Sequence, residues 1–86
     1  MERTLDRKLF AQRLKECRKR EFRTQEEFAK AIGKKIETIR NWEQGRTFPP
    51  TGEFIKICEI LNCSADYLTG RYDYDLMYAR KKRKQG

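Results

Sequence analysis

The side chains of this chain that are best suited to chemistry are basic and amide groups, and one short segment combines both kinds. Lys34, Lys35, Arg40, Asn41 and Arg46 all lie between residues 34 and 46. Ammonium, guanidinium and amide N–H groups donate hydrogen bonds, and the first two also attract anions. The chemistry that such a set supports is recognition of an anionic, hydrogen-bonding partner.

Residues for catalysis or metal binding form no comparable pattern. The chain has no histidine, and its three cysteines, Cys17, Cys58 and Cys63, form no Cys-x-x-Cys pair, so a zinc site lacks a recognisable set of ligands. The sequence also contains no Gly-rich phosphate loop and no nucleophile with an evident base. Because free cysteine packs as a small hydrophobe, we expect buried reduced thiols, no metal, no cofactor and no enzymatic activity.

The charge of the chain favours the same kind of partner. Of its 86 residues, 21 are Lys or Arg and 13 are Asp or Glu, which gives a net charge of +8. Residues 1–22, 23–50 and 71–86 are net basic, whereas residues 51–70 hold one basic and three acidic side chains. A basic excess of this kind favours a polyanion or an anionic membrane surface as the partner.

The sequence gives no sign of a membrane-spanning or secreted protein. No apolar run approaches the roughly 18 residues that a bilayer-spanning helix needs. Residues 1–6 lack the apolar core of a signal peptide. We therefore expect a cytoplasmic protein that has no membrane partner.

Two amphipathic helices are expected before the basic segment. Phe10, Leu14 and Cys17 recur at helical spacing, which predicts a helix over about residues 6–20. Thr24 and Glu27 have the spacing of a capping box, which marks the start of a second helix. Its inner face and its end are formed by Phe28, Ala29, Ile32 and the terminating Gly33.

The basic segment itself is expected to form a third helix, followed by a loop. This helix begins near Lys35 or Ile36 and runs to about Gln44, with two inward-facing apolar residues and a terminating glycine: Ile39, Trp42 and Gly45. Residues 46–50 form a loop because two consecutive prolines do not continue a helix.

Two further helices complete the expected all-α domain. Thr51 is expected to cap a fourth helix, which Asn62 ends, and Ser64 to cap a short fifth helix over residues 64–68, closed by Gly70. Residues 71–86 differ in character, with Tyr72, Tyr74, Leu76, Met77 and Tyr78 followed by the basic run Arg80–Lys84.

A fixed pattern of residues covers the second and third helices: Thr24-Gln25-x-x-Phe28-Ala29-x-x-Ile32-Gly33-x-x-x-x-Thr38-Ile39-x-x-Trp42-Glu43-x-Gly45-x-x-x-Pro49. The pattern closely resembles the phage Cro/repressor-type helix-turn-helix family, also called the XRE family. Residues 61–70 look like the segment that often closes such domains, so the resemblance covers about residues 7–70. It implies a compact five-helix, lambda-repressor-like DNA-binding domain, which we place at residues 1–70.

The resemblance implies structural roles as well as contacts with DNA. The helix at 25–32 would cross the DNA backbone and the helix at 36–44 would enter the major groove. Gln25 aligns with a family residue that hydrogen-bonds a phosphate and braces the recognition helix. Arg18 and Glu43 align with an ion pair that ties the first helix to the recognition helix.

The positions that face DNA also follow from the resemblance. The base-reading set is Ile36, Glu37, Arg40 and Asn41, with Lys35 beside it. Asn41 suits adenine, Arg40 guanine or a phosphate, and Glu37 a cytosine amino group. Contacts with the DNA backbone are expected from Gln25, Lys34, Lys35, Thr38 and Arg46, and such contacts supply affinity without direct sequence information.

The sequence departs from the family pattern in four places. Lys34 stands where an aliphatic residue is usual, and Lys35 where Ser or Thr usually caps the recognition helix. Residues 22–23 are Phe-Arg in place of the common Gly-Leu. Ile36 is apolar where a polar base-reading residue is usual, and two interpretations stay open: contact with a thymine methyl, or a repacked turn.

The function that these observations favour is sequence-specific binding of double-stranded DNA by a transcriptional regulator of bacterial or phage type. We expect a repressor that binds a palindromic site as a homodimer. The alternative is an antitoxin or protein-interaction module whose partner contacts residues 72–84. The extension at 71–86 is a disordered end, a phosphate-binding arm or a dimerisation helix, and residues 72–79 pack on the domain or on a second subunit.

Overall fold

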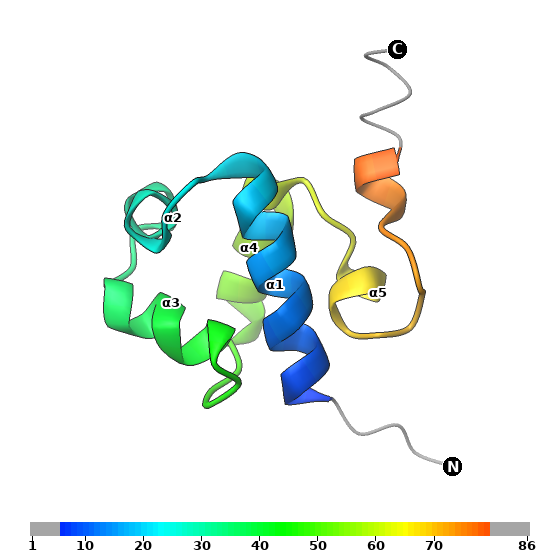
Figure 1. The fold of residues 1–86 in the computed structure, drawn as a ribbon, viewed down its shortest axis with the longest axis horizontal. Helices are drawn as coiled ribbons and strands as arrows, with labels where there is room; N and C mark the ends of the chain where they lie inside the picture. The colour runs from blue at the N-terminus through cyan, green and yellow to red at the C-terminus, as the bar shows by residue number, and fades with distance from the viewer. Residues whose placement is uncertain (1–5, 80–86) are drawn as a thin grey trace.

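The computed structural model describes residues 6–79, and the regular secondary structure in this part of the chain is all helical, with no strand. Figure 1 shows five labelled helices: α1 (Arg7–Glu21), α2 (Gln25–Ile32), α3 (Ile36–Glu43), α4 (Thr51–Leu61) and α5 (Ala65–Leu68). The chain becomes helical again at residues 76–79. The predicted all-α class and the order of the five helices are confirmed.

Helix α1 lies in the middle of the molecule and organises the core. It contacts α3, α4 and α5, while α2 contacts α3 and α4. In Figure 1, α2 and α3 lie on one side of α1, and α5 with the C-terminal segment lies on the other. The largest fully buried side chains include Phe10, Leu14, Phe28, Ile39, Ile57, Leu61 and Leu68.

The turn between α2 and α3 is fixed by local sequence signals. The Thr24 hydroxyl accepts the N–H of Glu27, and the Glu27 carboxylate accepts the N–H of Thr24, which forms the predicted capping box. Gly33 ends α2 in the left-handed conformation, with φ of 73°. Because glycine lacks a Cβ, it adopts this conformation without the steric cost that other residues meet. The predictions for both ends of α2 are confirmed.

The start of α4 corrects one prediction. Thr51 does not cap this helix: Pro50 occupies the cap position, with φ of −58° and ψ of 161°, and Thr51 is the first helical residue. Proline is suited to a position before the first turn because it has no N–H that would need an acceptor. Asn62 and Ser64 follow the prediction, since Asn62 ends α4 with φ of 51° and Ser64 caps α5.

The two glycines of α2 and α4 provide a matched pair of stability predictions. We expect Gly33→Ala to destabilise the fold by roughly 1–2 kcal/mol, because the left-handed backbone conformation is unfavourable for alanine. A steric clash does not contribute, since nothing lies within 4 Å of the added Cβ. Gly52→Ala, where the Cβ also meets nothing within 4 Å, should stabilise by up to about 1 kcal/mol, since α4 gains a better helix former. Urea unfolding of both variants measures this. Equal changes in the free energy of unfolding for the two variants would contradict the conformational role of Gly33.

No helix within residues 6–79 has both the length and the apolar content that a bilayer crossing requires.

Candidate nucleic-acid interface

Helix α3 presents one polar face to solvent and one apolar face to the core. Ile39 and Trp42 are buried on its inner side. Residues three, four and seven positions apart share one face of a helix, so Glu37, Arg40, Asn41 and Gln44 line the opposite side. Three of these are exposed and Asn41 is half-buried. The polar face of α3 is therefore available to a partner along its whole length.

A buried ion pair fixes α3 against α1. The guanidinium of Arg18 donates from Nε to Glu43 Oε2 at 3.0 Å and from Nη2 to Glu43 Oε1 at 3.1 Å. Both side chains are almost fully buried, with 5% and 2% of their surface exposed. Buried charges need this kind of bidentate pairing to offset the loss of hydration. The pair implied by the sequence resemblance thus joins α1 to the last residue of α3.

Gln25 extends this network to the start of α2. Its Nε2 donates to Glu43 Oε1 at 3.0 Å, and the side chain is half-buried. The amide nitrogen carries two hydrogens, so one supports Glu43 and the second can donate to another acceptor. Gln25 is also the first residue of α2, where backbone N–H groups favour an anion. The position suits both roles that the resemblance implies.

Two of the predicted DNA-contacting cations are engaged in ion pairs. Arg40 Nη1 lies 3.1 Å from Glu37 Oε1, one helical turn away, with 48% and 72% of the two side chains exposed. Lys34 Nζ lies 3.0 Å from Glu53 Oε1 on α4. The hydrogen bond from Lys34 lowers the pKa of Glu53. The Arg40–Glu37 pair is exposed and the Lys34–Glu53 pair is half-buried at the surface. Surface ion pairs contribute little to stability, so both are weak enough to exchange for a phosphate.

The remaining predicted contact residues surround the two ends of α3. Lys35 is exposed and occupies the N-cap position of α3 without a side-chain hydrogen bond to the helix. Arg46 is exposed in the loop after α3, and Thr38 is half-buried. The N–H groups of Arg46 and Thr47 donate to the carbonyl of Asn41, which closes the turn after the helix.

Ile36 occupies the place where the sequence left two interpretations open. Its side chain is half-buried and packs against the hydrophobic core. This contact accounts for an apolar residue at the first position of α3 and favours a repacked turn. Contact of the remaining exposed part with a thymine methyl stays a prediction.

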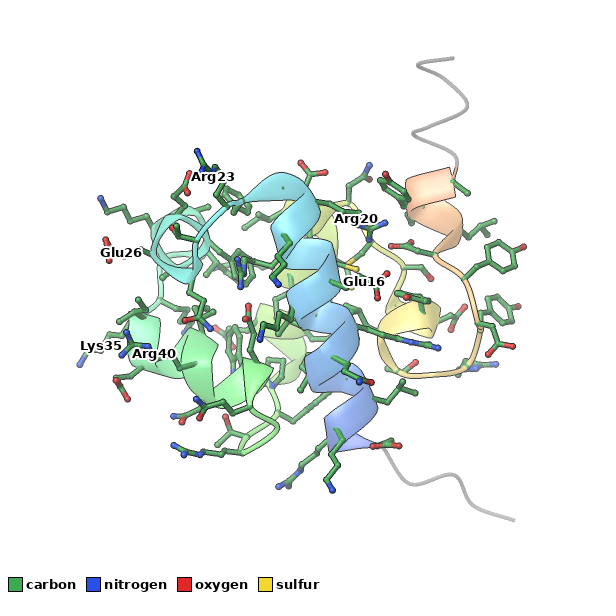
Figure 2. All side chains as sticks on the ribbon, in the orientation of Figure 1. Glu16, Arg20, Arg23, Glu26, Lys35 and Arg40 are labelled. Carbon is green, nitrogen blue, oxygen red and sulfur yellow. The ribbon has the colours of Figure 1, made fainter. Side chains whose placement is uncertain are left out.

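One residue of the polar face was missed by the sequence analysis. Gln44 is exposed at the C-cap of α3, seven residues after Glu37 and therefore on the same side of the helix. The helical spacing itself was a signal that could have found it. In Figure 2, Arg23, Glu26, Lys35 and Arg40 lie together on the side of the molecule that carries α2 and α3.

The other side of α1 holds a second cluster of polar contacts. Arg13 Nη1 donates to the carbonyls of Tyr67 at 2.6 Å and Tyr72 at 2.9 Å. Buried Asp75 accepts from Arg20 at 2.8 Å and from the N–H of Ser64 at 2.8 Å. Residues 72–79 therefore contact their own domain, and the run Arg80–Lys84 falls outside the described residues.

The structure brings together two cysteines and a carboxylate that the sequence analysis did not connect. Within residues 6–79, Cys17, Cys63 and Asp75 bring their ligand atoms within 4.8 Å of one another, and all three are buried. Cys58 is half-buried, where a buried thiol was expected. The sequence pattern missed this group because its members are separated by up to 58 residues and meet only through tertiary packing.

Comparison with known proteins supports the geometry of α2 and α3. A family model described as helix-turn-helix (HTH_3) matches residues 14–68, which is more than half of the chain. The match runs from the middle of α1 to the end of α5 and includes both helices of the turn. No curated protein matches the chain.

Proposed function

The chain belongs to the helix-turn-helix family HTH_3, of the Cro/repressor (XRE) type, and is a DNA-binding protein, and from this premise we propose that it represses transcription by occupying a specific operator. The observation that carries the proposal is the exposed polar face of α3, held in place by the buried Arg18–Glu43 pair. A helix of this kind enters the major groove, where each base pair presents a distinct pattern of donors and acceptors.

The residues of α3 divide between base contacts and backbone contacts. Ile36, Glu37, Arg40 and Asn41 are the proposed base-reading residues, and exposed Gln44 extends the same face. Lys34, Lys35, Thr38, Arg46 and Gln25 are the proposed backbone contacts. When Arg40 contacts a guanine, its ion pair with Glu37 can break or can persist beside the base. Either outcome is compatible with the structure because the pair is exposed and weak.

Repression is proposed to require a homodimer. A single small domain that reads one half-site has limited specificity, and a two-fold dimer doubles the contacts on a palindromic site with half-sites about one helical turn apart. Sedimentation of the free protein, and of the protein with its operator, measures the stoichiometry. One chain per half-site and two per operator is the expected result.

Selection of bound sequences from a random duplex pool tests the proposed function. At moderate salt, the wild-type chain is expected to enrich one short palindromic or pseudo-palindromic sequence. A pool that remains random would overturn sequence-specific binding, even if the protein retained its general affinity for DNA.

Asn41→Ala should relax the base preference at one position of the selected site by about 1–3 kcal/mol, because the bidentate amide contact with adenine is lost. Arg46→Ala is the matched control on a backbone contact. It should weaken all sequences to a similar degree and leave the preference unchanged. If Asn41→Ala instead weakened every sequence equally, its base-reading role would be wrong.

A second candidate function is supported by the exposed apolar residues after α5. Tyr72, Tyr74, Leu76 and Met77 are exposed large side chains, although Asp75 between them is buried. In this alternative the chain is an antitoxin or interaction module whose partner protein binds residues 72–84. Copurification of a stable partner, together with a pool selection that enriches no sequence, would favour it over the repressor.

A further inference from the structure

Two of the three cysteines lie side by side at the C-terminal end of α4. Asn62 ends this helix in the left-handed conformation, with φ of 51°, and the N–H of Cys63 donates to the carbonyl of Cys58 at 3.0 Å. The same hydrogen bond closes helices in the Schellman motif, where the side chains of the two joined residues are frequently in contact. It holds the two α-carbons within about 7 Å of each other, the limit beyond which a disulfide cannot form without movement of the backbone.

The two thiols of this pair differ in their access to solvent. Cys63 is buried, with 2% of its surface exposed, whereas Cys58 is half-buried, and both are free thiols. Both line a groove of about 570 Å³, whose other members include Glu59, Asp66 and Met77. A small molecule in this groove meets Cys58 first, with Cys63 behind it. Figure 1 shows the link from α4 to α5 on the opposite side of α1 from α3.

The contact between the two sulfurs makes Cys58 the more acidic thiol. A hydrogen bond from Cys63 lowers the pKa of Cys58, because it stabilises the thiolate, while burial and the charges of Asp75 and Glu59 oppose the shift. Hydrogen bonds with Cys17 and Cys58, together with burial, raise the pKa of Cys63. The two shifts agree, since Cys58 ionises first and Cys63 keeps the proton that it donates. The thiolate is the nucleophilic form of cysteine, so the outer sulfur is also the reactive one.

The third cysteine, Cys17, is held on the inner side of the cluster by other contacts. Its side chain is fully buried. Arg20 Nη2 lies 2.7 Å from Cys17 Sγ and 2.8 Å from Asp75 Oδ2, and Cys17 Sγ lies 3.8 Å from the same carboxylate oxygen. The guanidinium and the carboxylate therefore satisfy each other and enclose Cys17. The pair of thiols with a route to solvent is Cys58 and Cys63.

We propose that Cys58 and Cys63 form an oxidation site, at which hydrogen peroxide or another small hydroperoxide closes a disulfide at the end of α4. The Cys58 thiolate attacks one peroxide oxygen, the O–O bond breaks, and the leaving oxygen takes up the proton that the Cys58 thiol released. Cys58 then carries a sulfenic acid. The Cys63 sulfur attacks the Cys58 sulfur, the S–O bond breaks, and water leaves with the proton of Cys63. The two thiols supply the two electrons that reduce one peroxide.

The disulfide changes the contacts beneath residues 71–79. To form it, Cys63 turns its sulfur toward Cys58 and away from Cys17. Met77, which belongs to the C-terminal segment, lines the same groove, so oxidation alters the surface on which this segment packs. The oxidation site lies on the far side of α1 from α3 (Figure 1). The proposal therefore does not depend on which DNA sequence α3 reads, or on whether α3 reads one.

Peptide mapping of the full reduced chain after treatment with hydrogen peroxide tests the pair. Trypsin releases Cys58 and Cys63 together in the peptide of residues 57–71, and Cys17 in the separate peptide of residues 16–18. When free thiols are alkylated before digestion, the 57–71 peptide should carry no alkyl group and should lack the mass of two hydrogens, while Cys17 is alkylated. A disulfide that joins the two peptides, or alkylation of all three cysteines after a treatment that fully oxidises free cysteine, would overturn the proposal.

The order of attack has its own test, which begins with the wild type and so does not depend on the stability of a variant. With limiting iodoacetamide, Cys58 of the native chain should be alkylated at least about tenfold faster than Cys17 or Cys63, because it is the exposed and more acidic thiol. Cys63→Ala should leave Cys58 as a sulfenic acid, which a dimedone reagent captures. Cys17→Ala is the matched control and should still close the disulfide. Equal alkylation of the three native thiols, or a Cys63→Ala variant that forms no sulfenic acid at Cys58, would contradict the proposed site.

Discussion

Replacement of Glu43 by leucine is expected to lower the free energy of unfolding by about 3–5 kcal/mol. Glu43 accepts hydrogen bonds from Arg18 Nε, from Arg18 Nη2 and from Gln25 Nε2. Without it, the Arg18 guanidinium stays buried beside an apolar group, and a buried charge without its partner is costly. Chemical unfolding followed by circular dichroism measures the change.

Two controls separate the ion pair from a general effect of mutation in α3. Glu37→Ala removes the exposed partner of Arg40 and should change stability by no more than about 0.5 kcal/mol. The double variant Arg18→Met with Glu43→Leu should recover most of the loss, because apolar residues of similar volume can replace a buried pair. A Glu43→Leu variant as stable as Glu37→Ala would contradict the structural role of the pair.

DNA affinity is expected to fall about 10³-fold between 50 and 200 mM salt. If each protomer of a dimer brings Lys34, Lys35 and Arg46 to phosphates, six contacts form and the logarithm of affinity falls against the logarithm of salt with a slope of about −5. Lys34 contributes only if it leaves Glu53, and the half-buried surface pair that holds it is weak enough for this exchange. Fluorescence anisotropy with the selected duplex over a salt series measures the slope.

Single alanine variants assign the slope to residues. Lys35→Ala should flatten it by about 2 in a dimer, one unit for each protomer. Lys34→Ala should do the same if the lysine exchanges partners, and should leave the slope unchanged if it remains on Glu53. A wild-type slope near −3 that Lys34→Ala still flattens by about 1 would indicate one protomer on the DNA, and would contradict the proposed dimer.

Short-range signals made most of the helices predictable. Thr24, Glu27 and Gly33 specify both ends of α2 through contacts that span only a few residues, so they can be recognised without the fold. The prediction for the start of α4 was wrong, and the reason is also local. Both Pro50 and Thr51 can occupy the cap position of a helix, and no neighbouring residue indicates that Pro50 occupies it.

The polar contacts on the far side of α1 could not be predicted, because they join residues distant in sequence. Asp75 meets Cys17 and Arg20 across more than fifty residues, and no local pattern marks an aspartate that will be buried. Arg13 bridges two carbonyls near the end of the domain in the same way. The Arg18–Glu43 pair was anticipated only because a family resemblance supplied the missing long-range information.

The most direct test of the DNA-facing role of α3 is a nuclear magnetic resonance titration of the isotope-labelled chain with its selected duplex. The proposal predicts intermolecular contacts between the side chains of Arg40 and Asn41 and base protons in the major groove, with shifts at Gln44. It also predicts no such contacts for the exposed Ile55 of α4. Contacts confined to α4 or to residues 72–79, with the α3 resonances unchanged, would contradict it.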